Sequence, residues 1–268
     1  MAIRVVMAGA TGWVGRALIP VIAAQSDMVL AGAVARNAAG QDSGAAVGIQ
    51  PNGITISATL EEALAAPSDV VVDYTKPDVV KTNALAAIEK GRHMVIGTSG
   101  LGAADFAEID QAAQANGVGV LAAGNFSITA TLMKRFALMA AKYVPDVEII
   151  DYASAKKPDA PSGTARELAE ALADVRGAST AKPVAEVLGL PGTRGAAVGA
   201  GAGVQVHSLR LPSYILSCEA LFGLPDERLT IRHDAGSSAA PYVAGTLLAI
   251  RRVASFKGLV RGLDALMD

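Results

Sequence analysis

The stretch that decides the fold reads Gly9-Ala10-Thr11-Gly12-Trp13-Val14-Gly15, and it lies between the apolar run Ile3–Ala8 and the helical pattern Trp13–Gln25. Glycines at this spacing between a strand and a helix are a variant of the dinucleotide fingerprint. They allow a tight turn and let the backbone approach a pyrophosphate, which binds the amides at the helix start. A purely structural glycine turn is the alternative. We predict that the cofactor-binding residues here are Gly9, Thr11, Gly12, Trp13, Val14 and Gly15.

The rest of the first half alternates between apolar runs of strand length and helical patterns. The predicted strands are Met28–Val34, Val70–Tyr74, His93–Ile96 and Val118–Ala122, and the predicted helices are Leu60–Ala65, Pro77–Lys90 and Ala103–Asn116. Short apolar runs separated by helices are typical of βαβ units, whose right-handed crossovers build a parallel sheet buried on both faces. The sequence therefore predicts an α/β fold with a doubly wound Rossmann sheet.

The second half follows a different pattern. It has one strand–helix pair, then a glycine-rich stretch, and then three strand-like runs joined by short turns. These predicted elements are the strands Val147–Tyr152, Val204–Leu211, Tyr214–Phe222 and Arg228–His233 and the helices Ser162–Ala173 and Tyr242–Val253. Strands that follow one another through short turns favour a mixed or antiparallel sheet, and hence an α+β domain.

Composition excludes several classes of function. Of 268 residues, 51% are apolar and 18% charged, and the formal net charge is −2. A nucleic-acid binder that neutralises phosphates needs a basic excess, which is lacking. A single cysteine, Cys218, and three scattered histidines argue against disulfides and against a metal site. The longest run without charge, Gln111–Met133, is interrupted by polar residues and glycines, and the N-terminal stretch lacks a signal-peptide pattern. We expect a soluble, cytoplasmic protein.

Three further loops follow predicted strands and therefore fall at the carboxyl edge of the sheet, where such folds bind ligands. They supply the remaining candidate cofactor residues, which are Tyr74, Thr75, Gly97, Thr98, Ser99, Asn125 and Phe126. At the end of the second strand, Arg36 stands where an acid usually binds the ribose 2′-hydroxyl of NAD. A guanidinium suits a 2′-phosphate instead. We predict that NADPH is preferred and that NADH is tolerated, unless Arg36 is only a solvated loop residue.

A second candidate site lies at residues 156–164, which read Lys-Lys-Pro-Asp-Ala-Pro-Ser-Gly-Thr. Two prolines impose an extended turn, and the segment Ser162–Thr164 opens a helix. Amides at a helix start, two hydroxyls and adjacent ammonium groups form a receptor for a carboxylate. An ordinary helix cap with surface lysines is the alternative. The predicted substrate-binding residues at the helix start are Ser162, Gly163 and Thr164.

These segments together resemble the dihydrodipicolinate reductase family over nearly the whole chain. The resemblance is carried by the glycine turn and by DYTKP at 73–77, VIGTSG at 95–100, GNFS at 124–127, KKPDAPSGTA at 156–165, VHSLRLPS at 206–213 and LTIRHD at 229–234. It implies an NAD(P)H-dependent oxidoreductase of the diaminopimelate–lysine pathway that acts on a small carboxylate. It also implies a nucleotide domain over 1–126, completed by 237–268, and a substrate domain over 127–236 whose mixed sheet builds a homotetramer.

The chain departs from the family pattern just before this loop. Ala153 and Ser154 stand where the family has two adjacent histidines, one regarded as the proton donor, while Lys157 matches the family's catalytic lysine. We therefore predict Lys157 as the proton donor and Tyr152 as the runner-up, with Ser154 and Lys156 in substrate binding. Ser217-Cys218-Glu219 and Gly236-Ser237-Ser238 also replace a family His-Gln-Glu stretch and an arginine. We expect a weak dihydrodipicolinate reductase whose own substrate is a related carboxylated imine or enone.

Two other functions are compatible with parts of the sequence. Tyr152 and Lys156 form a YxxxK pattern like that of extended short-chain dehydrogenases, but that chemistry needs both residues on one helical face, and Pro158 and Pro161 follow. We expect instead a strand on which Tyr152, Ser154 and Lys156 share one face. A nucleotide sensor without catalysis is compatible with the missing histidines. The predicted carboxylate receptor at residues 156–164 is retained, however, and a sensor does not need one.

Overall fold

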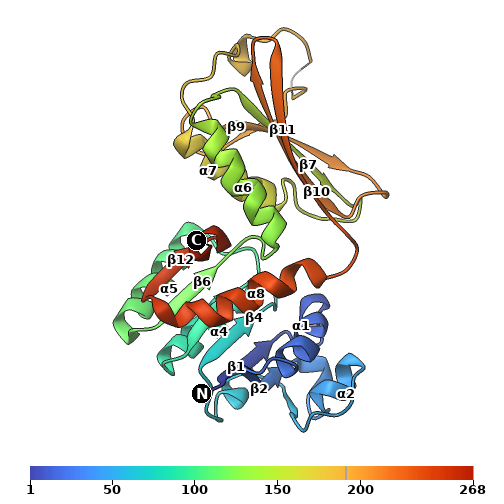
Figure 1. Ribbon diagram of the computed structural model, residues 1–268, viewed down its shortest axis with the longest axis vertical. Helices are drawn as coiled ribbons and strands as arrows, with labels where there is room; N and C mark the ends of the chain where they lie inside the picture. The colour runs from blue at the N-terminus through green and yellow to red at the C-terminus, as the bar shows by residue number, and fades with distance from the viewer. Residues whose placement is uncertain (191, 268) are drawn as a thin grey trace. The chain divides into compact units, whose positions relative to one another are not determined.

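The computed structural model describes residues 1–190 and 192–267 (Figure 1). Two compact units are present. Unit 1 comprises Met1–Ile128 together with 239–267, and unit 2 is the intervening part of the chain, Thr129–Ser238 apart from residue 191. The chain thus leaves unit 1 once, builds unit 2, and returns to unit 1.

Unit 1 contains a seven-stranded sheet in which every pairing is parallel. In spatial order its strands are β12 (Gly258–Arg261), β6 (Gly119–Ala122), β5 (His93–Ile96), β4 (Val70–Asp73), β1 (Ile3–Ala8), β2 (Met28–Val34) and β3 (Ile56–Ser57). The order runs outward from β1 in both directions, which is the doubly wound arrangement. The predicted Rossmann fold is confirmed.

Helices cover both faces of this sheet. They are α1 (Trp13–Ala23), α2 (Ser43–Val47), α3 (Leu60–Ala63), α4 (Pro77–Glu89), α5 (Ala103–Asn116) and α8 (Ala240–Arg252), with short 3-10 helices at Arg36–Ala38, Val253–Ser255 and Leu263–Leu266. Alternate residues of β1 enter two separate cores. Val5 and Met7 pack with α1 and α8, whereas Val6 and Ala8 pack with α4 and α5. Burial on both faces explains why the strands read as continuous apolar runs.

Unit 2 contains a mixed sheet of five strands. In spatial order they are β11 (Glu227–Ala235), β10 (Leu216–Leu224), β7 (Val147–Ala153), β9 (Val204–Arg210) and β8 (Ala196–Val198). β7 and β9 run parallel, and the other neighbours run antiparallel. Helices α6 (Ile128–Ala141) and α7 (Gly163–Val175) supply apolar side chains to the core on one face, which includes Ile149, Val206 and Ala220. The predicted α+β domain with a mixed sheet is confirmed.

Some elements lie outside the predicted set. β3 and β8 are only two and three residues long, and β8 lies in the glycine-rich stretch. β12 begins at Gly258 in a segment whose apolar run is too short to be distinctive. α6 was not predicted because its sequence begins within the uncharged run Gln111–Met133 and has no strong helical periodicity of apolar residues. These elements depend on neighbours already in place, since a two-residue strand is stable only beside a formed sheet.

Candidate active site

The glycine turn after β1 has the geometry expected of a phosphate loop. Gly9 has a φ of +85°, and a Cβ there would collide with the carbonyl of Tyr74. A Cβ on Gly15 would collide with the carbonyl of Gly9, so the third glycine lets α1 pack against the end of β1. The backbone is therefore exposed at the turn because no side chain fits, which suits the close approach of a pyrophosphate.

The first turn of α1 has no side-chain cap. Gly12 is the N-cap residue, and the first helical hydrogen bond runs from the Arg16 amide to the Gly12 carbonyl at 3.0 Å. The amides of Trp13, Val14 and Gly15 precede that bond and point out of the helix start. Arg16 also donates from Nε to the Thr11 carbonyl at 3.0 Å, which braces the turn. A helix start of this kind attracts an anion.

Two exposed side chains flank this turn. Trp13, 54% exposed, rests edge-on against Tyr242 with ring centroids 5.6 Å apart. Arg36 lies just beyond β2 in the 3-10 helix and is exposed, and its guanidinium forms no hydrogen bond or ion pair with another described residue. Its guanidinium is therefore available to a ligand at the carboxyl edge of β2.

The loops after β4 and β5 are joined through a residue that sequence reasoning missed. Asp73, at the end of β4, has no exposed surface. It accepts the hydroxyl protons of Thr75 at 2.6 Å and Thr98 at 2.9 Å, and Asn83 donates to its other oxygen at 2.8 Å. Ser99 is exposed beside them. Thr75 and Thr98 therefore have their conformations set by a buried carboxylate.

The Tyr74 side chain is partly buried and the Phe126 side chain is almost completely buried. The Tyr74 hydroxyl lies 2.8 Å from Thr246 Oγ1 of α8, and its ring lies over Gly97, where any Cβ would collide with it. Burial raises the pKa of Tyr74 far above its ordinary value. Phe126 is 1% exposed and packs edge-on against Tyr74. Both rings support the loops from beneath, which leaves their backbones at the sheet edge. Asn125 accepts the Ser127 amide at 2.8 Å, which shapes the loop after β6.

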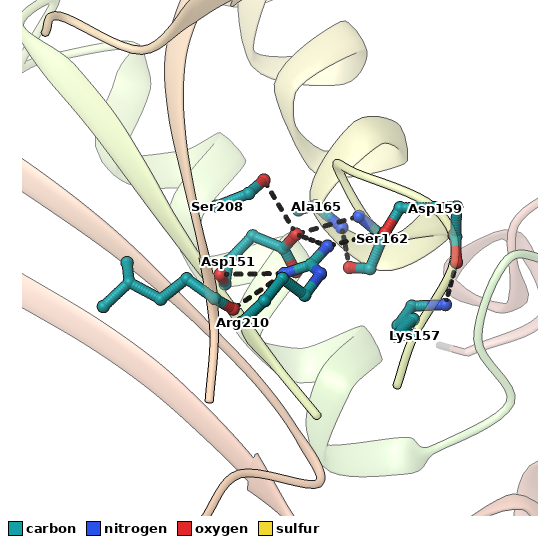
Figure 2. Close-up of polar contacts among 8 residues, drawn as sticks. Asp151, Lys157, Asp159, Ser162, Ala165, Ser208 and Arg210 are labelled. Atoms are coloured by element: carbon teal, nitrogen blue, oxygen red, sulfur yellow. Dashed lines mark hydrogen bonds and ion pairs between the residues drawn. The ribbon is translucent and has the colours of Figure 1, made fainter. Parts of the chain in front are cut away.

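In unit 2, a buried ion pair holds the start of α7 (Figure 2). Asp151, on β7, has no exposed surface and accepts from Arg210 of β9 at 2.8 Å, from the Ser162 amide at 2.9 Å and from the Ser208 hydroxyl at 3.1 Å. The same Arg210 nitrogen donates to the Asp159 carbonyl at 2.8 Å. Burial alone would raise the pKa of Asp151, but hydrogen bonds from Ser162 and Arg210 outweigh it and lower the pKa.

The start of α7 is placed as the sequence predicts. Ser162 is the N-cap, and its Oγ accepts the Ala165 amide at 3.3 Å. Gly163 and Thr164 form the first turn and are partly exposed, so their amides lie at the surface end of the helix. The Ser162 hydroxyl is already used as a cap, which leaves the first-turn backbone as the main anion-binding group.

The two lysines lie on a turn and not on a strand. β7 ends at Ala153, and the Lys157 amide then donates to the Ser154 carbonyl at 2.9 Å. The expectation that Tyr152, Ser154 and Lys156 share a strand face is therefore wrong, because the chain turns before the first proline. Lys157 Nζ lies 2.6 Å from the Asp159 carboxylate. Lys156 is exposed, and its ammonium group forms no hydrogen bond or ion pair with any other described residue.

Tyr152 is part of a polar cluster on the opposite face of the sheet from Asp151. Its hydroxyl donates to Glu219 at 3.0 Å, its ring lies against Tyr214, and the Arg232 guanidinium lies 4.8 Å from its ring centre. Burial, followed by Glu219, raises the pKa of Tyr152. Tyr152 lies on a strand, so the helical tyrosine–lysine arrangement of short-chain dehydrogenases is absent from this described segment.

Sequence reasoning missed Asp73, Asp151 and Arg210 as site residues. Each acts through partners distant in the chain, and Arg210 lies 59 residues from Asp151. A signal was nevertheless present, because Asp73 opens the DYTKP segment and Asp151 lies in the predicted strand that precedes the helix start at Ser162. Within residues 1–190 and 192–267, no group of three or more His, Cys, Asp or Glu side chains is arranged to hold a metal ion. In the same residues, no helix is long and apolar enough to cross a membrane.

Comparisons with known proteins agree along the whole chain. A family model described as "Dihydrodipicolinate reductase, N-terminus" matches residues 3–126, and one described as "Dihydrodipicolinate reductase, C-terminus" matches residues 129–267. The 4-hydroxy-tetrahydrodipicolinate reductase of Synechococcus elongatus is 40% identical over 272 residues, which cover 99% of this chain and 98% of that protein. The protein of the same name from Desulfitobacterium hafniense is 40% identical over 268 residues, 99% of each chain.

Comparison with solved structures also finds similarity to a dihydrodipicolinate reductase. A dipicolinate-bound dihydrodipicolinate reductase from Paenisporosarcina sp. TG-14 is similar with a TM-score of 0.81 and 31% identity, covering 100% of both chains. An amine dehydrogenase from Mycobacterium smegmatis is similar with a TM-score of 0.66 and 14% identity, covering 98% of this chain and 96% of that one. The second likeness concerns the fold alone.

Proposed function

The chain belongs to the dihydrodipicolinate reductase family of NAD(P)H-dependent oxidoreductases, and we propose that it reduces a carboxylated cyclic imine, or a related unsaturated acid, with NADPH. One observation carries the proposal. A single chain combines an uncapped glycine turn in a Rossmann sheet with a helix start whose loop is fixed by the buried Asp151–Arg210 pair. The first feature suits a dinucleotide, and the second suits a carboxylate.

The fit to the cofactor rests on the backbone of the turn. The cradle formed by Gly9 and Gly15 would be filled by any Cβ, and the Trp13, Val14 and Gly15 amides lie at its mouth. Arg36 supports a preference for NADPH, because its exposed guanidinium can form charge-assisted hydrogen bonds with a 2′-phosphate. NADH lacks that phosphate and would bind through the rest of the site.

The substrate carboxylate is proposed to bind at the start of α7. The backbone of Gly163 and Thr164 supplies donors there, and Lys157 and Lys156 supply positive charge on the preceding turn. Lys157 already holds a carboxylate, that of Asp159, so its ammonium group has the geometry of an anion receptor. A substrate carboxylate would replace Asp159 as its partner. Ser154 lies between the strand end and this turn.

The residues of the chain must also supply a proton. When bound, NADPH supplies a hydride, and the electron pair left on the substrate nitrogen or carbon takes up a proton from a nearby donor. Ala153 and Ser154 have no acidic proton to give, so Lys157 is the proposed donor. Tyr152 is the second candidate, but its hydroxyl is bound to Glu219. A reaction of this kind belongs to the diaminopimelate–lysine pathway of the family, and we place it in the cytoplasm.

A homotetramer built on unit 2 is part of the proposal. One face of the mixed sheet packs against α6 and α7, and the alternate residues point the other way. Ile150, Leu209 and Leu221 lie on that second face and are each partly exposed. Apolar side chains on an open sheet face support association between copies. Light scattering of the purified protein would measure the mass directly.

A second candidate function is a nucleotide sensor without catalysis. The observation in its favour is the replacement of the family histidines by Ala153 and Ser154, together with the Tyr152 hydroxyl bound to Glu219. The two functions differ in turnover. A sensor binds NADPH without consuming it, whereas a reductase oxidises many equivalents.

The deciding experiment mixes purified protein with NADPH and a panel of carboxylated cyclic imines, including 4-hydroxy-tetrahydrodipicolinate, and follows the absorbance of the reduced nicotinamide. Repeated turnover with at least one compound supports the proposal. Tight NADPH binding with no oxidation by any compound would refute it and favour the sensor.

A further inference from the structure

Asp73 is a buried carboxylate without a cation, and such groups are rare because an unpaired charge is costly to bury. It has no exposed surface, and no lysine or arginine among the described residues forms an ion pair with it. Its negative charge is balanced by hydrogen-bond donors alone. The Asp73 carboxyl group therefore depends on these donors for its place in the interior.

The donors around Asp73 come from three segments. One oxygen accepts from the Thr75 amide at 2.9 Å, the Thr75 hydroxyl at 2.6 Å and the Thr98 hydroxyl at 2.9 Å. The other accepts from Asn83 of α4 at 2.8 Å. The Asp73 carbonyl also accepts the Gly97 amide at 2.9 Å. One side chain therefore fixes the loop after β4 to the loop after β5.

This arrangement sets the direction of the threonine hydrogen bonds. Both hydroxyls donate to Asp73 Oδ1, and a threonine hydroxyl has only one proton to donate. Each Oγ1 then has only lone pairs left for another molecule. Thr75 and Thr98 are both partly exposed at the carboxyl edge of the sheet. Toward a ligand at this edge, they are hydrogen-bond acceptors and not donors.

The sheet order indicates which part of the cofactor would meet them. β2 lies on one side of β1, where Arg36 would hold the adenosine phosphate, and β4 and β5 lie on the other side. A dinucleotide centred on the glycine turn therefore extends its nicotinamide half over β4 and β5. That half carries hydrogen-bond donors, namely the carboxamide N–H groups and the ribose hydroxyls.

We infer that Asp73 is a positioning residue that joins two loops and presents Thr75 and Thr98 as acceptors to the donors of the nicotinamide half. The inference rests on the proposed use of NADPH. It predicts that the threonine hydroxyls contribute to cofactor binding only through Asp73, which itself lies beneath the surface.

The test measures the affinity of the purified protein for NADPH by calorimetry. Thr98→Val should weaken binding about fivefold, the size of one neutral hydrogen bond, and Asp73→Ala should weaken it about tenfold or more because both loops lose their anchor. Asp73→Asn keeps one accepting oxygen, so its affinity for NADPH should lie between those of the wild type and Asp73→Ala. Thr82→Val, an exposed change on α4, and Asp69→Ala, just before β4, are matched controls that should bind normally.

Binding of a cofactor analogue shows which group of NADPH donates a hydrogen bond to Thr98. The reduced 3-acetylpyridine analogue of NADPH lacks the carboxamide N–H groups. If Thr98→Val binds this analogue as well as the wild type does, the threonine accepts from the carboxamide. If the fivefold loss remains, the donor is a ribose hydroxyl. Both results support the acceptor role.

Equal NADPH affinity of the wild type, Thr75→Val and Thr98→Val would overturn the inference. Circular dichroism verifies that each variant is folded, and the threonine variants decide the matter if Asp73→Ala does not fold. Failure of the wild type itself to bind NADPH would instead overturn the proposed function, so the two failures are distinguishable.

Discussion

A nitrogen of Arg210 lies 2.8 Å from the Asp151 carboxylate and 2.8 Å from the Asp159 carbonyl, so one guanidinium joins a buried strand residue to the surface loop that precedes α7. Asp151 in turn accepts the Ser162 amide. The loop is thus attached to the sheet at two points, Asp159 and Ser162. A carboxylate receptor needs such rigidity, because donors must hold their directions without a ligand.

Loss of the Arg210 guanidinium should destabilise unit 2. Arg210→Ala leaves the Asp151 charge buried and unpaired, which typically costs about 3–5 kcal/mol of unfolding free energy. Arg251→Ala breaks a partly exposed pair with Asp27 and should cost less than about 1 kcal/mol. Urea unfolding measures both variants. Equal losses in the two variants would contradict the role given to the buried pair.

The same carboxylate predicts a pH dependence of stability. The pKa of Asp151 is lowered in the folded state, so its stabilising contribution is present above the pKa of an unfolded aspartate, about 3.9, and is lost as the pH falls through the folded-state pKa. Asp151→Asn cannot titrate at this position. The unfolding free energy of the wild type should therefore fall more steeply than that of Asp151→Asn under acid conditions. Parallel curves would contradict the expectation.

Arg36→Ala should weaken NADPH binding at least tenfold and leave NADH binding unchanged. The loss corresponds to about 1.5–3 kcal/mol for hydrogen bonds to a charged group. Trp13 is the single tryptophan of the chain and lies at the start of α1, so its emission can report binding of either cofactor. Lys90→Ala, an exposed change at the end of α4, is the control. Equal wild-type affinity for the two cofactors would disprove the preference.

Lys157→Ala should lower kcat about 10²–10⁴-fold if Lys157 supplies the proton. The neighbouring Lys156→Ala removes an equal charge from an exposed position and should alter mainly KM. Tyr152→Phe tests the second candidate, whose hydroxyl is bound to Glu219. A rise in KM alone for Lys157→Ala would leave this residue a carboxylate binder. An unchanged rate with the true substrate would remove Lys157 from the mechanism altogether.

Turnover of 4-hydroxy-tetrahydrodipicolinate should fall below the ordinary enzyme range of roughly 1–10³ per second, because the family histidines are replaced. Ser154→His should raise the rate, since position 154 is partly exposed. Ala153→His should instead impair folding, because Ala153 has no exposed surface. A wild-type rate within the ordinary range would show that the chain uses another effective proton donor.

The sequence was most informative where structure is local. Apolar runs and glycine spacing predicted β1, β2 and the start of α1, because burial on both faces of a parallel sheet leaves a continuous pattern. The residues that support the site were harder to find. Asp73 and Asp151 look like ordinary strand-end acids, and their roles depend on partners such as Thr98 and Arg210 that only folding brings near.

The strand end at Ala153 shows a further limit. A pattern of alternating residues cannot reveal that the chain turns one residue later, because the turn is stabilised by backbone bonds from Ala155 and Lys157. Lys156 and Lys157 therefore lie on a loop, and not at the end of a strand as the sequence suggested. Their placement on the loop, and not their spacing, decides what they can bind.

The position of α8 and β12 in the chain has a consequence for biosynthesis. Both are translated after the whole of unit 2, yet β12 pairs with β6 and α8 covers Phe126. A nascent chain therefore emerges from the ribosome with the β6 edge unpaired and an apolar surface uncovered. Such a surface is a target for chaperones and for aggregation until translation reaches the last strand. Synthesis of unit 1 thus begins before that of unit 2 and is completed after it.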